Sequence, residues 1–392
     1  MIVPPPAAAD GPPPAPAPAR SARPALRAAR ATAPEREGAA RTRTARLMSA
    51  RLLLLCLLIA LPVAALASIA LGAASLPFGE VWRDVASHLT GGGRPPGISG
   101  IDDEIIWGSR MPRILLAMVA GAGLAVAGAV LQTVVRNPLA DPYVLGVTSG
   151  ASLAAVAVLT LGPVGVLGPL RIGVPAAAFA GACATLALVV ALSRSRGTTA
   201  PVRLVLAGVA LSYLLQGVTS YLQLRARPDQ LSGVLFWLLG SVAGARWPDL
   251  GLPAALVVIC TAWLLSHGRS LNALAMGEET AAFLGVRVHM LRLQLLAVSA
   301  LLTAAVISVA GGISFVGLVV PHSVRLLIGS DHRSLLPATA LAGALFLLLA
   351  DLAARTVAAP MELPLGILTA VAGAPFFLWL LRRDRSVPGR EA

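Results

Sequence analysis

The chain has 392 residues, of which 57% are hydrophobic and only 12% charged, and its mean hydropathy is +0.80. Apolar runs of about 20 residues follow one another along it, which excludes a soluble globular protein and indicates an all-α polytopic membrane protein. The net charge is +13 and every basic residue is Arg, but the arginines are scattered at the ends of the apolar runs, which argues against a nucleic-acid-binding protein.

The N-terminal tail differs in composition from the rest of the chain. Residues 1–46 are rich in Pro, Ala and Arg and have few large apolar side chains, so we expect this tail to be disordered. A transit peptide is an alternative that the prolines disfavour, and a misassigned upstream start codon is another. A transmembrane domain over 47–385 and a short C-terminal tail over 386–392 are expected to follow.

The apolar runs predict about ten membrane crossings, the first of which is expected to be uncleaved. They cover residues 52–71, 114–135, 143–161, 174–192, 204–222, 252–266, 293–310, 313–328, 335–354 and 365–381. The run 313–328 contains Pro321 and is predicted to form half-helices, and the short run 234–242 to form an interfacial or re-entrant helix. Ten crossings place both termini on one side, and the excess of Arg on that side predicts that both are cytoplasmic.

Three motif blocks lie at the ends of these runs. The first extends from Arg110-Met-Pro-Arg113 through Asn137-Pro-Leu-Ala-Asp-Pro142 to Gly146-Val-Thr-Ser-Gly150-Ala151. The second is Gly312-Ile-Ser-Phe-Val-Gly317-Leu-Val-Val-Pro-His322, and the third is Glu362-Leu-Pro-Leu-Gly366 followed by Gly373-Ala-Pro375. In this order the blocks resemble the FecCD family over roughly residues 52–383, and the resemblance is specific because all three occur together.

FecCD proteins are the membrane permeases of ABC importers for iron–siderophore complexes, haem and vitamin B12. The resemblance implies the type II ABC importer permease fold with an inverted repeat, in the cytoplasmic (inner) membrane of a bacterium. It implies three kinds of partner: an ABC ATPase in two copies, an extracytoplasmic substrate-binding protein and a second permease subunit. The second permease subunit would make a homodimer or a related heterodimer. No cofactor is expected, and the chain is not expected to be an enzyme, since it has no G-x-x-x-x-G-K-[ST] motif. The expected cargo is a ferric siderophore, with haem or cobalamin next.

Arg110 and Arg113 precede the second run, and Arg355 lies at the end of the ninth, four residues after Asp351. Arginines at such places often only extend towards the membrane interface, and Asp351 with Arg355 can form a self-satisfying pair on one helix face. The resemblance implies a sharper role, in which Arg110, Arg113 and Arg355 dock the binding protein through its surface glutamates, with Asp351 orienting Arg355.

The turn after the second run contains Asn137 and Leu139, and the next turn on that side contains Thr198 and Thr199. Pro138 requires the chain to leave the helix here, so a plain turn capped by Asn137 is the simplest interpretation. The resemblance implies that Asn137 and Leu139 close the cytoplasmic end of the transport pathway. Thr198 and Thr199 are weaker candidates for a second constriction.

Residues 267–292 form the longest polar segment inside the membrane domain. The stretch from Glu278 to Gly285 predicts a short capped helix, which could be only a solvent-facing loop helix. Its place between the sixth and seventh runs resembles the coupling helix that ABC permeases insert into the ATPase. The residues that carry this match are Gly277, Glu278, Ala281, Leu284 and Gly285.

The histidine and cysteine residues do not suggest a metal site. Cys56, Cys183 and Cys260 fall inside apolar runs and are interpreted as small buried hydrophobic residues. The five histidines show no metal-like cluster by spacing, and His322 is interpreted as structural. An ion-coupled secondary transporter is the alternative function, but its titratable residues near mid-membrane are missing from these runs apart from Asp351.

Overall fold

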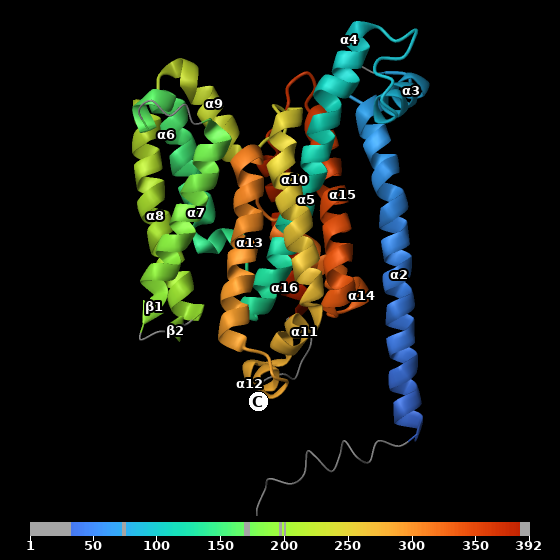
Figure 1. Cartoon of the computed structure of the whole chain (residues 1–392), viewed down its shortest axis with the longest axis vertical. Coiled ribbons are helices and arrows are strands. Elements are labelled where there is room, and N and C mark those ends of the chain that lie inside the picture. The colour runs from blue at the N-terminus through green and yellow to red at the C-terminus, as the bar shows by residue number, and fades with distance from the viewer. Residues whose placement is uncertain (1–32, 73–75, 168–172, 196–197, 200, 385–392) are drawn as a thin grey trace, which may run out of the picture. The chain divides into compact units, whose positions relative to one another are not determined.

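The computed structural model describes residues 33–72, 76–167, 173–195, 198–199 and 201–384 (Figure 1). The chain divides into two compact units, Met1–Met48 and Ser49–Ala392. The helix α2 begins at Ala33, inside the segment predicted as a tail, and it is the only element described in the first unit. The disorder expected for residues 1–32 and the tail over 386–392 lie outside the described residues.

Over the described residues the protein is all-helical apart from one two-residue strand pair. In chain order the elements are α2 (Ala33–Ala70), α3 (Phe78–Leu89), α4 (Gly100–Asp103), the π-helix η1 (Glu104–Arg110), α5 (Met111–Val135), the 3-10 helix η2 (Pro142–Leu145), α6 (Val147–Leu167), α7 (Val174–Ser193), β1 (Arg194–Ser195), β2 (Thr198–Thr199), α8 (Pro201–Arg225), α9 (Pro228–Leu239), α10 (Trp247–Ser266), α11 (Gly268–Met276), α12 (Glu278–Phe283), α13 (Val288–Ala310), α14 (Val316–Ile328), α15 (His332–Thr356) and α16 (Leu365–Asp384).

Among the described residues, seven helices are long and apolar enough to cross a membrane. Three shorter apolar helices, Val147–Gly162, Val316–Ile328 and Leu365–Leu378, occupy the places of three further predicted crossings. The fold class predicted from sequence is therefore confirmed, while the internal inverted repeat stays a prediction. The structure defines the bounds of two regions that the sequence left open. The predicted interfacial piece is the helix α9, and the run with Pro321, predicted as half-helices, is the single short helix α14.

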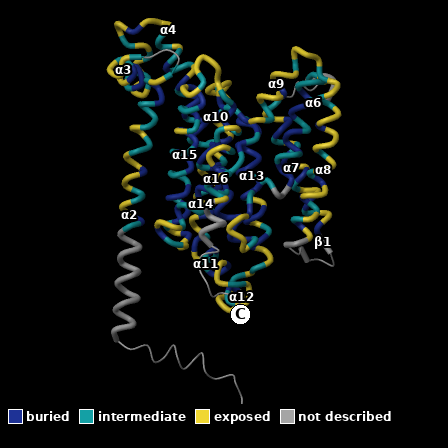
Figure 2. The backbone as a smooth tube through the Cα atoms, turned by 180° about the vertical axis from the view of Figure 1, so that it is seen from behind, coloured by how far each residue is buried: buried dark blue, intermediate teal, exposed yellow. Residues whose placement is uncertain are grey.

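The helices of the second unit differ sharply in burial. We compared the most apolar 18-residue stretch of each helix. The buried share of this stretch is 78% for α5 and 67% for α13, but only 17% for the membrane part of α2 and 22% for α8. α5 packs against α10, α13, α14 and α15, whereas α6, α7 and α8 form a second group joined to it through α13. Exposed positions run along α8 (Figure 2). The outer helices therefore offer apolar surface to lipid or to another chain, and α5 is the centre of the bundle.

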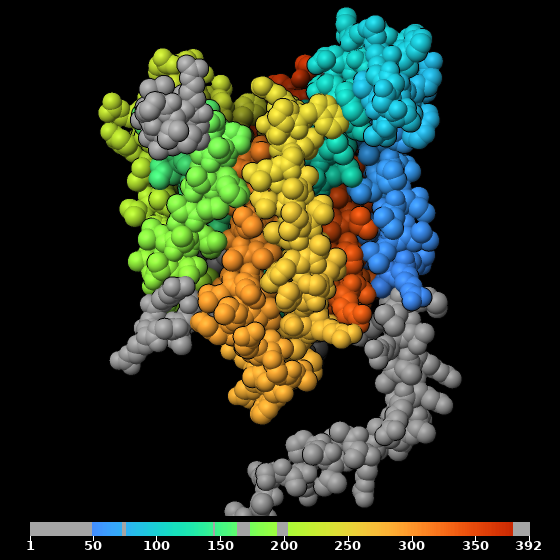
Figure 3. Space-filling view, in the orientation of Figure 1, coloured from blue at the N-terminus to red at the C-terminus, as the bar shows by residue number. Residues whose placement is uncertain are grey.

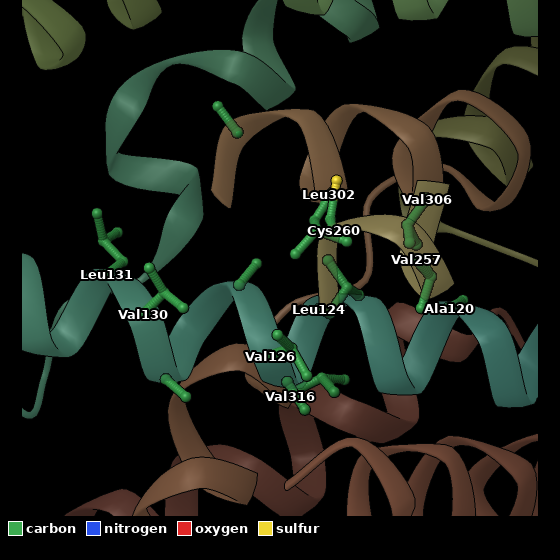
Figure 4. Packing of buried hydrophobic residues seen from close by; sticks show 14 of the residues in the cluster. Ala120, Leu124, Val126, Val130, Leu131, Val257, Cys260, Leu302, Val306 and Val316 are labelled. Atoms are coloured by element: carbon green, nitrogen blue, oxygen red, sulfur yellow. The ribbon is translucent and has the colours of Figure 1, made fainter. Parts of the chain in front are cut away.

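Small residues bring the central helices together. A Cβ atom on Gly121 would lie 2.1 Å from the carbonyl oxygen of Gly343 on α15, and one on Gly128 would lie 1.8 Å from that of Gly317 on α14. Such backbone contact is the usual way in which membrane helices gain packing energy, because lipid gives them no hydrophobic drive to associate. Larger side chains fill the space beside these contacts: Figure 4 shows Leu124 directed towards α10 and α13, and Val126 towards Val316 of α14.

Candidate functional site

The three predicted docking arginines meet at one end of α5. We call Arg110, Arg113 and Arg355 the arginine cluster. Arg113 on α5 donates from Nε to the Asp351 carboxylate at 2.9 Å, and the Nε of Arg355 lies 3.2 Å from the other Asp351 oxygen. Asp351 is fully buried, so it holds two guanidinium groups in fixed positions. The ion pair between Asp351 and Arg355 that their helical spacing predicts is thus present.

A second acid completes the cluster from the segment before α16. Arg113 donates from its terminal nitrogen to both carboxylate oxygens of Glu362, at 2.9 and 3.0 Å. Hydrogen bonds between two charged groups are stronger than those between neutral groups. The Glu362 side chain is 45% exposed, whereas that of Arg113 is 9% exposed. Sequence reasoning assigned no role to Glu362, although it begins the third motif block, because nothing local relates it to Arg113.

The remaining donors of the arginine cluster bond to the end of α2. Arg110 donates to the carbonyl oxygens of Ile69 and Ala70, and Arg355 donates to the carbonyl oxygen of Ser68 at 3.0 Å. The three arginines line one polar cavity of about 120 Å³. Its other lining residues are Gly72, Ser109, Ala359, Pro360 and Glu362. A carboxylate that reached this cavity would meet several guanidinium donors at once.

The opposite end of α5 leads into the predicted gate turn. Arg136 takes a left-handed conformation with φ +56°, which ends the helix. The Asn137 side chain accepts a hydrogen bond from the Leu139 backbone N–H at 2.9 Å, which closes a tight turn around Pro138. Both Asn137 and Leu139 are exposed. The structure therefore shows the capped turn that local sequence predicts and places both residues on its surface, and their gating role stays a prediction.

The second predicted constriction is a hairpin rather than a simple turn. Thr198 and Thr199 form β2, which pairs antiparallel with Arg194 and Ser195 of β1. On the same helical group, an open hollow of about 410 Å³ lies against α8. Its lining consists of Tyr143, Ser149, Val209, Ser212, Tyr213 and Gln216, none of which carries a charge.

The predicted coupling segment consists of two short helices, α11 and α12, separated at Gly277, whose φ is +127°. Phe283 and Leu284 are 91% and 65% exposed, while Ala281 between them and the core is fully buried. The space-filling view shows this α11–α12 segment projecting from the bundle (Figure 3). Glu278 forms an ion pair with Arg292, so it holds α12 to α13 rather than presenting a free charge. Gly285, with φ +80°, ends the segment.

A polar network ties α11 to the centre of the bundle. Asn272 on α11 accepts a hydrogen bond from the backbone N–H of His332 at 2.9 Å and lies 2.8 Å from that histidine's Nδ1. The other ring nitrogen of His332 lies 2.7 Å from the Thr133 hydroxyl on α5. The network therefore links α11 to α5 and α15 through side-chain contacts. Sequence reasoning missed this network, because its members are far apart in the chain.

The cysteine interpretation holds only in part. Cys260 is buried in the main core, Cys183 is half-buried and Cys56 is exposed on the outer helix α2. All three are free thiols. His322 lies on α14, half-buried, and its structural role stays a prediction.

Comparison with known proteins agrees with this arrangement. The family model described as the FecCD transport family matches residues 57–383. The chain is 48% identical over 285 residues to the cobalamin import system permease protein BtuC of Halobacterium salinarum, covering 72% of this chain and 75% of that one. It is 40% identical over 333 residues to the hemin transport system permease protein HmuU of Yersinia pestis, covering 83% and 93%.

A solved structure has the same fold. It is an inward-facing conformation of an ABC transporter assigned to the metal-chelate type, with a TM-score of 0.71, 34% sequence identity, and coverage of 84% of this chain and 98% of that one. The matched region contains the arginine cluster, the gate turn and the α11–α12 segment. The protein therefore belongs to the FecCD family of multi-pass ABC importer permeases.

Proposed function

We propose that this chain is the permease subunit of a binding-protein-dependent importer that moves a metal chelate across the cytoplasmic membrane of a bacterium. The observation that carries the proposal is the open, uncharged hollow against α8. Polar groups on a membrane-crossing helix normally face a water-filled path or another protein chain, because lipid cannot hydrogen-bond them. Tyr213, Gln216 and Ser220 are exposed on one face of α8, and we infer that this face lines the pathway.

A transport pathway needs two walls. The exposed face of α8 is one wall, and a second permease subunit related by a two-fold axis would place an equivalent hollow opposite it. An uncharged wall with few polar groups suits a bulky chelate that must be released rather than held. Ferric siderophores come first as the expected cargo, with haem and cobalamin next. Transport assays in which the cognate binding protein is loaded with each chelate in turn will rank them.

In this proposal the α11–α12 segment binds the ATPase subunit that drives transport. The exposed Phe283 and Leu284 are suited to insert into a groove on a separate ATPase subunit, of which two copies serve the dimer. The roles proposed for Gly277, Ala281 and Gly285 are conformational, since they shape and seat α12, and Glu278 anchors it to Arg292. Movement of α12 would reach α5 and α15 through Asn272 and His332.

Replacing Phe283 and Leu284 together by serine should abolish ATP-driven uptake while the chain stays folded. Truncation of buried interface anchors costs about 2 kcal/mol or more each, which is roughly thirtyfold in affinity. The measurement is chelate uptake by proteoliposomes containing the permease, its ATPase and the loaded binding protein, with and without internal ATP. ATPase pull-down on the same preparations reports the interface directly.

The control for this experiment is Phe78→Ser, which truncates an exposed aromatic residue at the start of α3. It should leave uptake and ATPase binding unchanged. Uptake that persists without ATP and follows an imposed ion gradient would favour the secondary transporter instead. The titratable group expected for that alternative, Asp351, is held between Arg113 and Arg355.

The arginine cluster is proposed to dock the extracytoplasmic binding protein. Arg110, Arg113 and Arg355 already have internal partners, so a glutamate of the binding protein has to compete with Glu362 for Arg113. Glu362 is half-exposed and can leave without exposing a buried charge. Guanidinium–carboxylate contacts are strong and directional, so this exchange would set the register of docking.

Glu362→Gln should therefore tighten docking of the binding protein by roughly tenfold or more, since a charge-assisted hydrogen bond contributes about 1.5–3 kcal/mol. Arg110→Gln should weaken it, and both effects should fall as salt is raised. Surface-based binding measurements on nanodisc-embedded permease give both affinities. Glu104→Gln, an exposed acid six residues before Arg110, is the control. Equal affinities for all variants would refute the docking role. Charge reversal at Arg113 is avoided, because it would place a carboxylate against buried Asp351.

The gate and the orientation complete the proposal. We infer that Asn137 and Leu139, exposed at the end of α5 that also bears the α11–α12 segment, close the cytoplasmic end of the pathway. Both chain termini are then cytoplasmic, as the arginine distribution predicts. The arginine cluster lies on the extracytoplasmic side.

A further inference from the structure

The helix α3 contains a buried carboxylate that the transport proposal does not use. Asp84 shares the buried face of α3 with Val81 and Val85 and is 0% exposed. Neither of its carboxylate oxygens accepts a hydrogen bond from a residue that the structure describes. Buried carboxylates are nearly always paired with a donor or a cation, because leaving them without one is costly. Among the described residues its possible charge partner is His88, which is charged only when it is protonated.

The groups that face Asp84 are metal ligands rather than ordinary donors. His88 is one turn further along α3, with its Nδ1 3.6 Å from an Asp84 oxygen. Asp103 reaches in from α4, and its Oδ1 lies 3.3 Å from the Nε2 of His88. This Asp103 oxygen is also buried without a hydrogen-bond donor among the described residues. One ligand atom from each of the three residues lies within 4.8 Å of the others.

The orientation of the His88 ring decides what the cluster can bind. Its Nδ1 is 3.1 Å from the Asp84 carbonyl oxygen, so the ring can donate there and leave the Nε2 lone pair directed at Asp103. The ring is also stacked on Trp107, with centroids 4.4 Å apart. The ring is therefore already held in place, as in metal sites whose ligating histidine is oriented by a second hydrogen bond.

A cation at this point would have to compete with a proton on Asp84. Burial raises the pKa of the Asp84 carboxyl, His88 opposes that rise and the neighbouring Asp103 adds to it. Two carboxylates and one imidazole match a three-ligand zinc-type site with one open position. The partial exposure of His88 and Asp103, with side chains 14% and 25% accessible, gives a cation a way in.

We propose that Asp84, His88 and Asp103 bind one divalent transition-metal cation of the zinc class. The cation would join α3 to α4, directly before η1 and Arg110, and so fix the segment that leads into the arginine cluster. The site corrects the expectation that no histidine belongs to a metal-like cluster. Sequence reasoning overlooked that Asp84 and His88 are four residues apart and so share one face of a helix. The proposal is independent of the cargo and of the transport mechanism.

Zinc titration of the full chain tests the proposal. Protein free of affinity-tag histidines is treated with chelator, exchanged into detergent buffer and titrated with Zn²⁺ alone by calorimetry. We expect saturable binding of one ion per chain and a Tm that rises with zinc concentration. Asp84→Asn and His88→Gln should each weaken binding by more than roughly tenfold, which is the lower bound for loss of even an outer-shell partner of a metal site.

His267→Gln is the matched control, because its ring also stacks on a tryptophan, Trp263 at 4.1 Å, beside a serine hydroxyl. It should bind zinc as the wild type does. Asp84→Asn keeps the side-chain shape and removes the buried charge, so it should fold without metal, and its Tm should not respond to zinc. A wild-type Tm that changes with pH but not with zinc or chelator would show a proton shared between the two acids and overturn the proposal. Unchanged zinc affinity in Asp84→Asn and His88→Gln would overturn it as well.

Discussion

Replacing Gly128 by alanine should cost the folded protein about 3 kcal/mol, at the upper end of the usual range for overpacking. The added methyl carbon would lie 1.8 Å from the carbonyl oxygen of Gly317, and the obstructing atoms are backbone rather than a flexible side chain. α5 and α14 would have to move apart, and α5 is the helix around which the bundle packs. Thermal unfolding of the purified chain in detergent measures the loss as a lower Tm and a shorter half-life.

Gly251→Ala is the control for this prediction. Gly251 lies in the helix α10, and nothing lies within 4 Å of a Cβ atom placed there. Alanine is a better helix former than glycine, so this change should be neutral or stabilising by up to about 1 kcal/mol. Equal Tm values for the two alanine variants would show that α5 and α14 separate without cost, contrary to the packing described above.

Sequence alone predicts a helix well where an uninterrupted apolar run marks it. The uninterrupted apolar stretch 114–135 predicts a membrane helix, and α5 covers it in full. The glycines in that stretch indicate close packing, and Gly121 and Gly128 do touch other helices. The sequence does not say which helices they touch, because small residues favour any neighbour with a matching small residue. α3 was missed because sequence reasoning treats the stretch up to Pro112 as one polar segment, although Val81 and Val85 have the four-residue spacing of one helix face.

In the candidate site, contacts between residues close in sequence could be predicted, and contacts between distant residues could not. Local spacing predicts the ion pair of Asp351 with Arg355 and the capped turn at Asn137. It cannot predict that Arg113 shares Asp351, since the two residues are 238 positions apart and meet only because α5 packs on α15. The short helix expected from Glu278 is present as α12, whereas α11 was missed, because sequence reasoning treats residues 267–292 as one polar segment.

Replacing Asp351 by leucine should destabilise the protein by about 3–5 kcal/mol, the cost of removing one partner of a buried ion pair. The change leaves Arg113 and Arg355 buried beside each other without the carboxylate that lies between them. Arg113→Met should also destabilise the fold, since it leaves buried Asp351 with Arg355 as its remaining partner in the pair. Urea or thermal unfolding of each variant in the same detergent gives the free energies.

The double variant Asp351→Leu with Arg113→Met decides whether the pair acts as a unit. The charges of Asp351 and Arg113 are then both gone, buried Arg355 keeps its bond to the Ser68 carbonyl, and half-exposed Glu362 is solvated. Its loss should therefore be smaller than the sum of the two single losses by about 1–3 kcal/mol. Asp229→Asn, in an exposed pair with Arg227, is the control and should change stability by less than about 1 kcal/mol. Strictly additive losses at Asp351 and Arg113 would mean that the arginine cluster is held by its backbone contacts to α2, and that the buried acid is not what positions it.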